Sequence, residues 1–237
     1  MLFRSRWLVG LALLTLAASA EELPILGLAN VGLRVSNLEK ARVFYRTVCG
    51  LDEALAIKAP DGAVQAAYFK VNDRQFVILE PGFPAEAAIA LTHIAMKTEQ
   101  IERLHGMMAK LGLNPTEIRT GADGNLVFSI SQLPGQALDR LEFLQYVPGS
   151  LSEQTTGRFL SPRRISQHLE HAGIVVTDYA AAYNFYSKTL GFQDRYRRLT
   201  YDRRSVVLEQ LRMPGPEVEF VELFNQTDLP GAVTRQR

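Results

Sequence analysis

The chain of 237 residues is predicted to adopt an α+β fold in which one unit, a strand followed by a helix and about three further strands, is repeated. Two observations support this prediction. Two stretches separated by a fixed offset match without a gap, and strand-like runs bounded by turns follow each predicted helix. A unit of this kind exposes strand edges and one apolar sheet face, so we expect the units to pair into cupped mixed sheets.

The repeat joins "GLANVGLRVSNLEKARVFYRTVCGL", residues 27–51, to "QHLEHAGIVVTDYAAAYNFYSKTLGF", residues 167–192. The offset is 141 positions (171 minus 30). It pairs Gly32 with Gly173, Phe44 with Phe185, Tyr45 with Tyr186 and Gly50 with Gly191. Because the match keeps the spacing of the apolar positions as well as their identity, we interpret both stretches as the same structural element.

Each copy predicts a short buried strand and then an amphipathic helix. Helix starts are indicated by Ser36, with Glu39 three residues on, and by Thr177-Asp178. Gly50 and Gly191 are expected to end the helices. The predicted apolar faces consist of Leu38, Ala41, Phe44, Tyr45 and Val48 in the first copy, and Tyr179, Ala182, Phe185, Tyr186 and Thr189 in the last.

A weaker copy, "LTHIAMKTEQIERLHGMMAKLGL", lies between the two and has His93 in the position of Asn30. Its register slips by one residue before Gly112, and its apolar face is predicted to be Ile101, Leu104, Met108 and Leu111. The strand-like runs after the three helices are 65–71, 75–80, 125–130, 140–146, 205–211 and 217–224.

These units predict the domain organisation. We expect two paired units over 25–149, a polar linker over 150–164, a third unit over 165–226 and a tail over 227–237. The third unit has no partner unit in the chain, because only thirteen residues follow Phe224.

The first twenty residues predict an export signal. Arg4 and Arg6 precede the apolar run Trp7–Ala18, and small residues end at Ala20, so we expect cleavage there and a periplasmic or secreted protein. The run is shorter than the roughly 20 residues of a membrane span, so no stable membrane anchor is expected. A net charge of +1 with mixed signs offers no basic field for nucleic acid. The one cysteine, Cys49, cannot form an internal disulfide and is expected in the core.

Five segments together resemble the vicinal-oxygen-chelate superfamily, which includes glyoxalase I, extradiol dioxygenases and bleomycin-resistance proteins. They are "VGLRVSNLEKARVFYRTVCGL", "THIAMKTEQIERLHGMMAKLGL", "LEFLQY", "HAGIVVTDYAAAYNFYSKTLGF" and "VEFVEL". The resemblance implies βαβββ modules paired into cupped mixed sheets. It also implies a divalent metal held by a histidine on the first strand and a glutamate on the last strand of each module.

Carried over residue by residue, the resemblance implies that His93 and Glu142 are metal ligands in the second module, and His171 and Glu219 in the third. Glu142 and Glu219 are also the expected catalytic carboxylates, which would move a proton. Imidazole and carboxylate together suit Fe, Zn, Mn or Ni. His168 and Glu222 are excluded because an odd spacing from the chosen ligands places them on the opposite strand face.

The first module departs from this pattern. Asn30 replaces the histidine and Ile78 occupies the glutamate position, with Glu80 two residues on and on the same face. If modules one and two pair, their cup holds His93 and Glu142, with Asn30 or Glu80 as weaker helpers. A homodimer through the third module would instead bring His171 and Glu219 of both chains into one site with four ligands.

Three functions follow as expectations. The first is a metal-dependent lyase, isomerase or ring-cleaving dioxygenase that acts on a small oxygenated substrate. The second, favoured by the ligand losses in module one, is a metal-free small-molecule-binding protein of the bleomycin-resistance type. The third is a shortened inactive relative. Two interpretations of a basic cluster stay open: it is an exposed turn, or it steers an anionic substrate. The cluster consists of Arg195, Arg197, Arg198, Arg203 and Arg204.

Overall fold

A computed structural model describes residues 22–82 and 90–228. The expected export signal at 1–20 lies outside these residues, as does most of the expected tail. Within the described ranges, no helix has both the length and the apolar character needed to cross a membrane.

The strands and helices occur in three consecutive sets. The first set is β1 (Gly27–Val35), α1 (Leu38–Thr47), β2 (Asp52–Lys58), β3 (Val64–Asn72) and β4 (Gln75–Pro81). The second is β5 (Ala90–Lys97), α2 (Ile101–Lys110), β6 (Arg119–Thr120), β7 (Leu126–Ile130) and β8 (Arg140–Gln145). After the short helix η1 (Glu153–Thr155), the third is β9 (His171–Val176), α3 (Tyr179–Tyr183), a π-helical turn η2 (Asn184–Thr189), β10 (Gln193–Leu199), β11 (Val206–Arg212) and β12 (Phe220–Asn225), followed by η3 (Gln226–Asp228).

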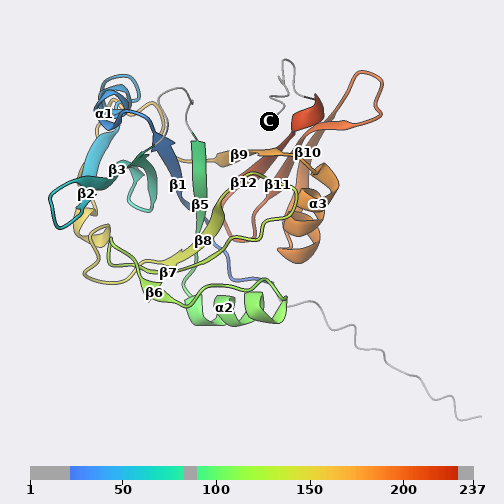
Figure 1. Ribbon diagram of the computed structural model, residues 1–237, viewed down its shortest axis with the longest axis horizontal. Coiled ribbons are helices and arrows are strands. Elements are labelled where there is room, and N and C mark those ends of the chain that lie inside the picture. Colours follow the sequence, from blue (N-terminus) through green and yellow to red (C-terminus); the bar gives the residue numbers. More distant parts are fainter. Residues whose placement is uncertain (1–21, 83–89, 229–237) are drawn as a thin grey trace, which may run out of the picture.

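The strands form an eight-stranded sheet with the order β2-β3-β4-β1-β5-β8-β7-β6 and a four-stranded sheet with the order β10-β11-β12-β9. In every set the first strand lies parallel to the last, as β1 to β4, β5 to β8 and β9 to β12. Antiparallel pairing of β1 with β5 joins the first two sets, and the larger sheet curls around its inner face (Figure 1). The predicted α+β class with cupped mixed sheets is confirmed. β9 is the last strand in the order of the smaller sheet and is therefore one of its two edge strands.

Local sequence accounts for the helix ends. The side chain of Asn37, one residue after the predicted Ser36, caps α1 by accepting from the Lys40 N–H at 2.9 Å. Asp178 caps α3 in the same way through the Ala181 N–H. Gly50 and Gly191 adopt left-handed backbone angles, with φ of +67° and +75°, as expected for residues that end helices.

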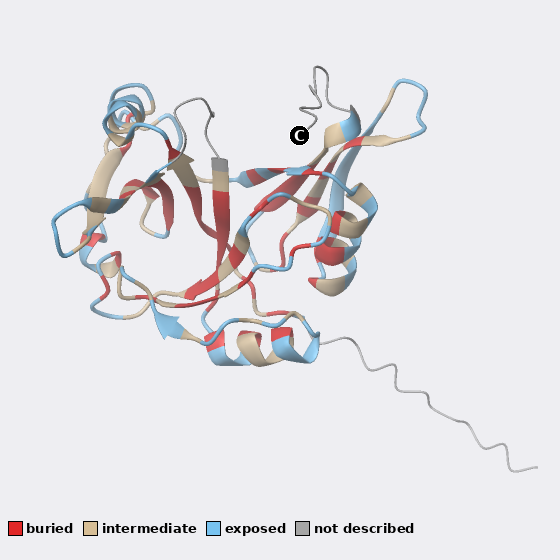
Figure 2. Ribbon diagram, in the orientation of Figure 1, coloured by how far each residue is buried: buried red, intermediate tan, exposed pale blue. Residues whose placement is uncertain are grey.

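The helices pack on their sheets to different extents. Of the predicted face of α2, Ile101, Leu104 and Met108 are fully buried, whereas the prediction is wrong for Leu111, which is 47% exposed. In α1 the prediction is wrong for Phe44 and Val48, which are 49% and 64% exposed. The other predicted positions of α1, Leu38, Ala41 and Tyr45, are partly buried against one hydrophobic core that runs through all three sets of elements. Figure 2 shows this core as a buried band along the central strands.

The carboxylate of Glu219 ties the smaller sheet to the larger one. Glu219 lies just before β12 and is completely buried. It accepts hydrogen bonds from the Leu28 N–H and from Gln75 Nε2, the latter at 2.7 Å. Lys97 Nζ lies 3.5 Å and His168 Nε2 3.4 Å from Glu219 Oε1. These partners come from β1, β4, β5 and the segment before β9, so one carboxylate holds four parts of the chain together.

Two further features close this junction. A Cβ atom on Gly27, whose φ is +119°, would overlap Glu219 Oε2, so the contact requires glycine at position 27. The expected linker is packed as well, because the buried Lys70 ammonium pairs with Asp73 at 2.7 Å and donates to the Thr155 carbonyl. The segment 150–164 is therefore attached to the first set of elements.

Burial raises the pKa of Glu219, against the opposing effects of Lys97 and the Leu28 N–H. A carboxyl whose pKa is higher in the folded than in the unfolded protein stabilises the fold at low pH, and that contribution is lost as the pH rises through the folded pKa. Glu219→Gln removes this loss. We therefore predict that the difference in unfolding free energy, variant minus wild type, increases as the pH rises from 4 to 8, measured by urea denaturation. A difference that stays constant or falls would contradict the assignment.

Candidate functional site

The inner face of the eight-stranded sheet contains a cavity of about 170 Å³, which we call the first cup. Its polar residues come from six strands and from the turn between β6 and β7. They are Asn30 on β1, Tyr68 on β3, Glu80 on β4, His93 on β5, Arg119 on β6, Arg140 and Glu142 on β8, and Asp123 and Asn125 in the turn. Strand alternation explains the placement, because Ile94 and Met96 of β5 are buried in the core shared with α2, which leaves His93 on the inner face.

The strand register brings the predicted residues together. His93 lies opposite Arg140, and Ala95 opposite Glu142, in the parallel pair β5·β8. The imidazole of His93 is 2% exposed, with Nε2 3.0 Å from Asn30 Oδ1 and 3.8 Å from Glu142 Oε2. Its Nδ1 lies 3.7 Å from Glu80 Oε1. The expected grouping of His93 and Glu142 with Asn30 and Glu80 is therefore present.

Sequence reasoning missed Arg140, which lies at the centre of this group. Its Nε donates to Glu142 Oε1 at 2.7 Å, and one terminal nitrogen donates to His93 Nδ1 at 3.2 Å. The same nitrogen lies 3.9 Å from Glu80 Oε1. The guanidinium thus supplies the positive charge that both carboxylates face.

These bonds define the state of His93. Because Nδ1 accepts from Arg140, the proton of the neutral ring is on Nε2 and is donated to Asn30 Oδ1. Burial lowers the pKa of His93, Glu142 opposes this shift, and the charge of Arg140 adds to it. The imidazole is therefore neutral near pH 7, with both nitrogens engaged.

The donors in the first cup do not fit a divalent metal. A metal ligand needs a free imidazole lone pair and a carboxylate oxygen open to the ion. Here the lone pair of His93 Nδ1 accepts from a cationic side chain, and Glu142 is bonded to the same side chain. Across residues 22–82 and 90–228, no group of three or more His, Cys, Asp or Glu side chains is arranged to hold an ion.

In the third set of elements the predicted pairing of His171 with Glu219 is wrong. His171 Nε2 lies 3.7 Å from Glu222 Oε2, while Glu219 is turned toward the junction and has His168 as its neighbour. The register explains the error. Gly173 lies opposite Glu222 just as Ala95 lies opposite Glu142, so Glu222 is the counterpart of Glu142 and its exclusion by strand parity is also wrong.

We call the outward face of the four-stranded sheet around His171 and Glu222 the open face. The His171 ring stacks on Phe220 with centroids 4.7 Å apart, and Glu222 Oε1 accepts from Gln210 Nε2 at 2.8 Å. The His171 side chain is 44% exposed, and Val175 on the same strand face is 46% exposed. A single histidine and a single glutamate provide two donors, which is fewer than a metal centre needs.

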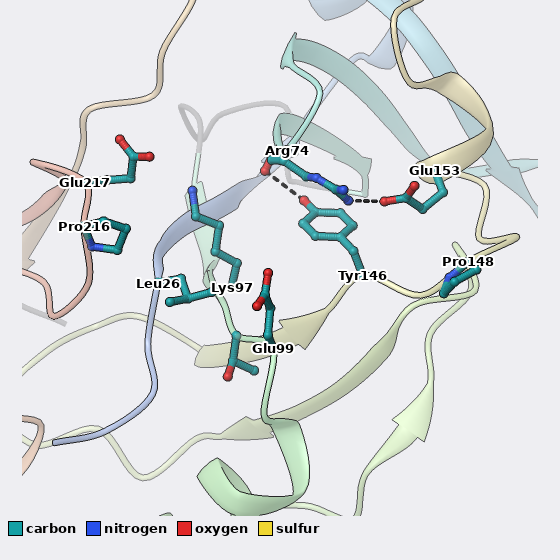
Figure 3. A pocket seen from close by; sticks show the side chains of 10 residues that line it. Leu26, Arg74, Lys97, Glu99, Tyr146, Pro148, Glu153, Pro216 and Glu217 are labelled. Carbon is teal, nitrogen blue, oxygen red and sulfur yellow. Dashed lines mark hydrogen bonds and ion pairs between the residues drawn. The ribbon is translucent and has the colours of Figure 1, made fainter. Parts of the chain in front are cut away.

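A larger cleft of about 430 Å³ lies at the junction of the two sheets (Figure 3). Arg74 stacks over the Tyr146 ring at 4.9 Å and pairs with Glu153, and the Tyr146 hydroxyl donates to the Arg74 carbonyl. Lys97, on another wall, is paired with Glu219. Both cations in this cleft already have carboxylate partners, so the first cup is the stronger candidate site.

The sequence contains signals that would have found the missed residues. Arg140 stands two residues before Glu142, so period-two alternation places both side chains on one face. Alignment of "LEFLQY" with "VELFNQ", in place of "VEFVEL", selects Glu222. Nothing comparable indicates that Glu219 reaches back to Leu28, because that contact joins residues 191 positions apart.

Comparison with known proteins identifies relatives of this fold. Residues 27–131 match the family model of the Glyoxalase/Bleomycin resistance protein/Dioxygenase superfamily. A variant of homoprotocatechuate 2,3-dioxygenase from Brevibacterium fuscum is similar in structure, with a TM-score of 0.63 and 19% identity, covering 87% of this chain and 55% of that one. No curated protein sequence matches significantly.

Two further structures from the same organism agree. An extradiol ring-cleaving dioxygenase gives a TM-score of 0.63 at 19% identity and covers 87% of this chain and 56% of that one. Homoprotocatechuate 2,3-dioxygenase in complex with 3,4-dihydroxyphenylacetate gives 0.64 at 18% identity, with coverage of 87% and 62%. The chain thus spans between half and two thirds of these proteins, and at such identity the likeness shows the fold alone.

Proposed function

We propose that the first cup binds a small oxygen-bearing molecule without a metal, because residues 27–131 match the family model of the Glyoxalase/Bleomycin resistance protein/Dioxygenase superfamily and the chain folds like extradiol dioxygenases. The observation that carries the proposal is the position of Arg140, bonded to both His93 and Glu142. This favours the metal-free binding protein over the metal-dependent enzyme.

The cup offers donors and acceptors side by side. Arg140 keeps 31% of its side chain exposed, so N–H groups not used by Glu142 and His93 are available to a ligand oxygen. Glu80 can accept from a ligand hydroxyl, since its side chain is 21% exposed. Burial raises the pKa of Tyr68, which keeps its hydroxyl protonated as a further donor. A ligand with two neighbouring oxygens, one accepting from Arg140 and one donating to Glu80, satisfies this set.

Apolar side chains complete the walls. Ile78, Val127 and Leu144 line the cavity together with Ala66. A cavity of about 170 Å³ restricts the ligand to a small molecule. The class that fits is therefore a small molecule with an apolar body and vicinal oxygens, such as a catechol or a 2-hydroxy acid.

Calorimetric titration in the presence of EDTA tests this proposal, with catechol, 3,4-dihydroxyphenylacetate and lactate as probes. We expect at least one probe to bind the wild type and Arg140→Ala to weaken it by about 10- to 100-fold, the equivalent of a lost charged hydrogen bond. Arg203→Ala, an exposed arginine outside the cup, serves as the control and should bind normally. Binding that appears only when a metal is added would contradict the proposal, as would equal binding by Arg140→Ala.

The open face supports a second candidate function, a metal site shared by two copies of the chain. Within the first cup, Asn30 and His93 occupy equivalent strand positions, and the antiparallel β1·β5 pair brings their side chains within 3.0 Å. The same pairing of β9 with β9 of a second copy would bring the two His171 rings together, each with its Glu222. Two histidines and two glutamates form a donor set that suits Fe, Zn, Mn or Ni.

The free edge of β9 leaves room for this arrangement. Gln136 bridges to Val176 at one end of the strand, and the Thr177 N–H donates to the Gly135 carbonyl. In the β1·β5 register Gly32 lies opposite His93, so the equivalent dimer register places Gly173 opposite His171 of the second copy. This register is centred on Ala172. It does not require the end of β9 near Val176, where Gln136 is bridged to the strand.

Elemental analysis combined with solution mass tests the shared site. We expect about half a metal per chain in a dimer, and loss of the metal in His171→Ala and in Glu222→Ala. His93→Ala and Glu142→Ala should keep it, which separates the two sites. Metal that survives the loss of His171, or tight binding of a metal by a monomer, would overturn the shared site and leave the first proposal standing.

A further inference from the structure

The hairpin of β10 and β11 extends from the edge of the four-stranded sheet. β10 ends the strand order, and every one of its residues is exposed. Figure 1 shows the hairpin projecting from the fold, and Figure 2 shows its tip as exposed. Residues 193–204 contain five arginines and two aspartates, a net charge of +3 (5 minus 2), whereas the whole chain carries +1.

Neighbouring residues neutralise only part of this charge. Arg197 pairs with Glu209, and Arg195 donates to Gln210 and lies 3.6 Å from Glu170. Arg198 and Arg203 form no ion pair with any residue in the described ranges. The Arg204 side chain is 87% exposed, with Asp202 3.5 Å away. Arg198 on β10 and Arg203 in the turn therefore lack a carboxylate partner among the described residues, and the exposed Arg204 has only the exposed Asp202.

The tip itself is an ordered turn. The Arg203 N–H donates to the Thr200 carbonyl at 2.9 Å, and the Thr200 hydroxyl donates to Asp202 Oδ1 at 2.6 Å. Arg203 adopts a left-handed φ of +58°, which is unfavourable for a residue other than glycine. This turn presents Tyr201 at 106% relative exposure, beside Leu199 at 41%. The tip is thus an ordered turn that carries a fully exposed aromatic ring two residues before Arg203 and Arg204.

We propose that this hairpin tip docks on an anionic lipid membrane surface. A tyrosine places its ring at the level of the lipid headgroups, and arginines bind the headgroup phosphates. Charge alone has a simpler role on an edge strand, since it prevents edge-to-edge pairing. That role does not account for the exposure of Tyr201 in the turn and of Leu199 at the end of β10. Insertion of the tip into the membrane interface accounts for both the charge and the exposed apolar groups.

Sedimentation with vesicles tests the proposal on the full chain. The probes are vesicles of phosphatidylcholine alone and vesicles with about a third phosphatidylglycerol. We expect the wild type to bind the anionic vesicles more tightly, with binding that weakens as salt rises. Each arginine near an anionic surface contributes about fivefold. The combined variant Arg198→Gln, Arg203→Gln and Arg204→Gln should therefore lose about 100-fold, and Tyr201→Ser should weaken binding further.

The matched control removes three exposed lysines elsewhere, through Lys40→Gln, Lys58→Gln and Lys110→Gln, and so makes the same change in net charge. We expect this control to bind anionic vesicles nearly as the wild type does. The wild type and both triple variants carry the same N-terminal run with Arg4 and Arg6, so any contribution from that segment is equal in all three proteins. Equal losses in both triple variants would overturn the proposal, as would equal binding to both vesicle types. Binding to heparin without binding to vesicles would reassign the hairpin to a soluble polyanion.

Discussion

The guanidinium of Arg140 determines what the first cup can do. It lies opposite His93 across the β5·β8 pair and bonds to Glu142 on its own strand. A buried imidazole and two part-buried carboxylates without a cation would carry a large desolvation cost, so some positive charge is required at this point. In this chain the cation is a side chain. The charges of the cup are therefore compensated by a side chain of the protein, and its remaining hydrogen-bonding groups line the cavity.

The same strand register produces two sites of opposite character. In the larger sheet it places Asn30 against His93, and in the smaller sheet it leaves His171 and Glu222 on an open face. Phe220 stands where Arg140 stands in the first cup, since each lies opposite the histidine of its set. Consequently, within residues 22–82 and 90–228, no cationic side chain bonds to His171, and Arg195 stacks on the Phe220 ring instead. The two sheets share the same backbone arrangement and differ in the residue opposite the histidine. Arg140 compensates the charges of the first cup, whereas Phe220 leaves the imidazole of His171 without a charged partner at the same position.

Much of the fold could be predicted from the sequence, and less of the site. The repeat and its helix-ending glycines indicated the strand–helix–strand units because these signals are local. The pairing of His93 with Glu142 was also accessible, since both occupy recurring positions in their units. His171 was matched to the wrong carboxylate because "VEFVEL" contains two glutamates three positions apart, and hydrophobic pattern alone does not choose between them. The role of Glu219 depends on tertiary contacts across the whole chain, for which no local pattern exists.

The most direct test of this account is anomalous diffraction from crystals equilibrated with excess Zn²⁺ or Co²⁺, which locates bound metal without reference to activity. We expect no anomalous peak between His93 and Glu142, with the Arg140 side chain present in density between them. A metal peak at that position, with Arg140 displaced from Glu142, would contradict the central claim that a side chain of the protein supplies the positive charge in the first cup.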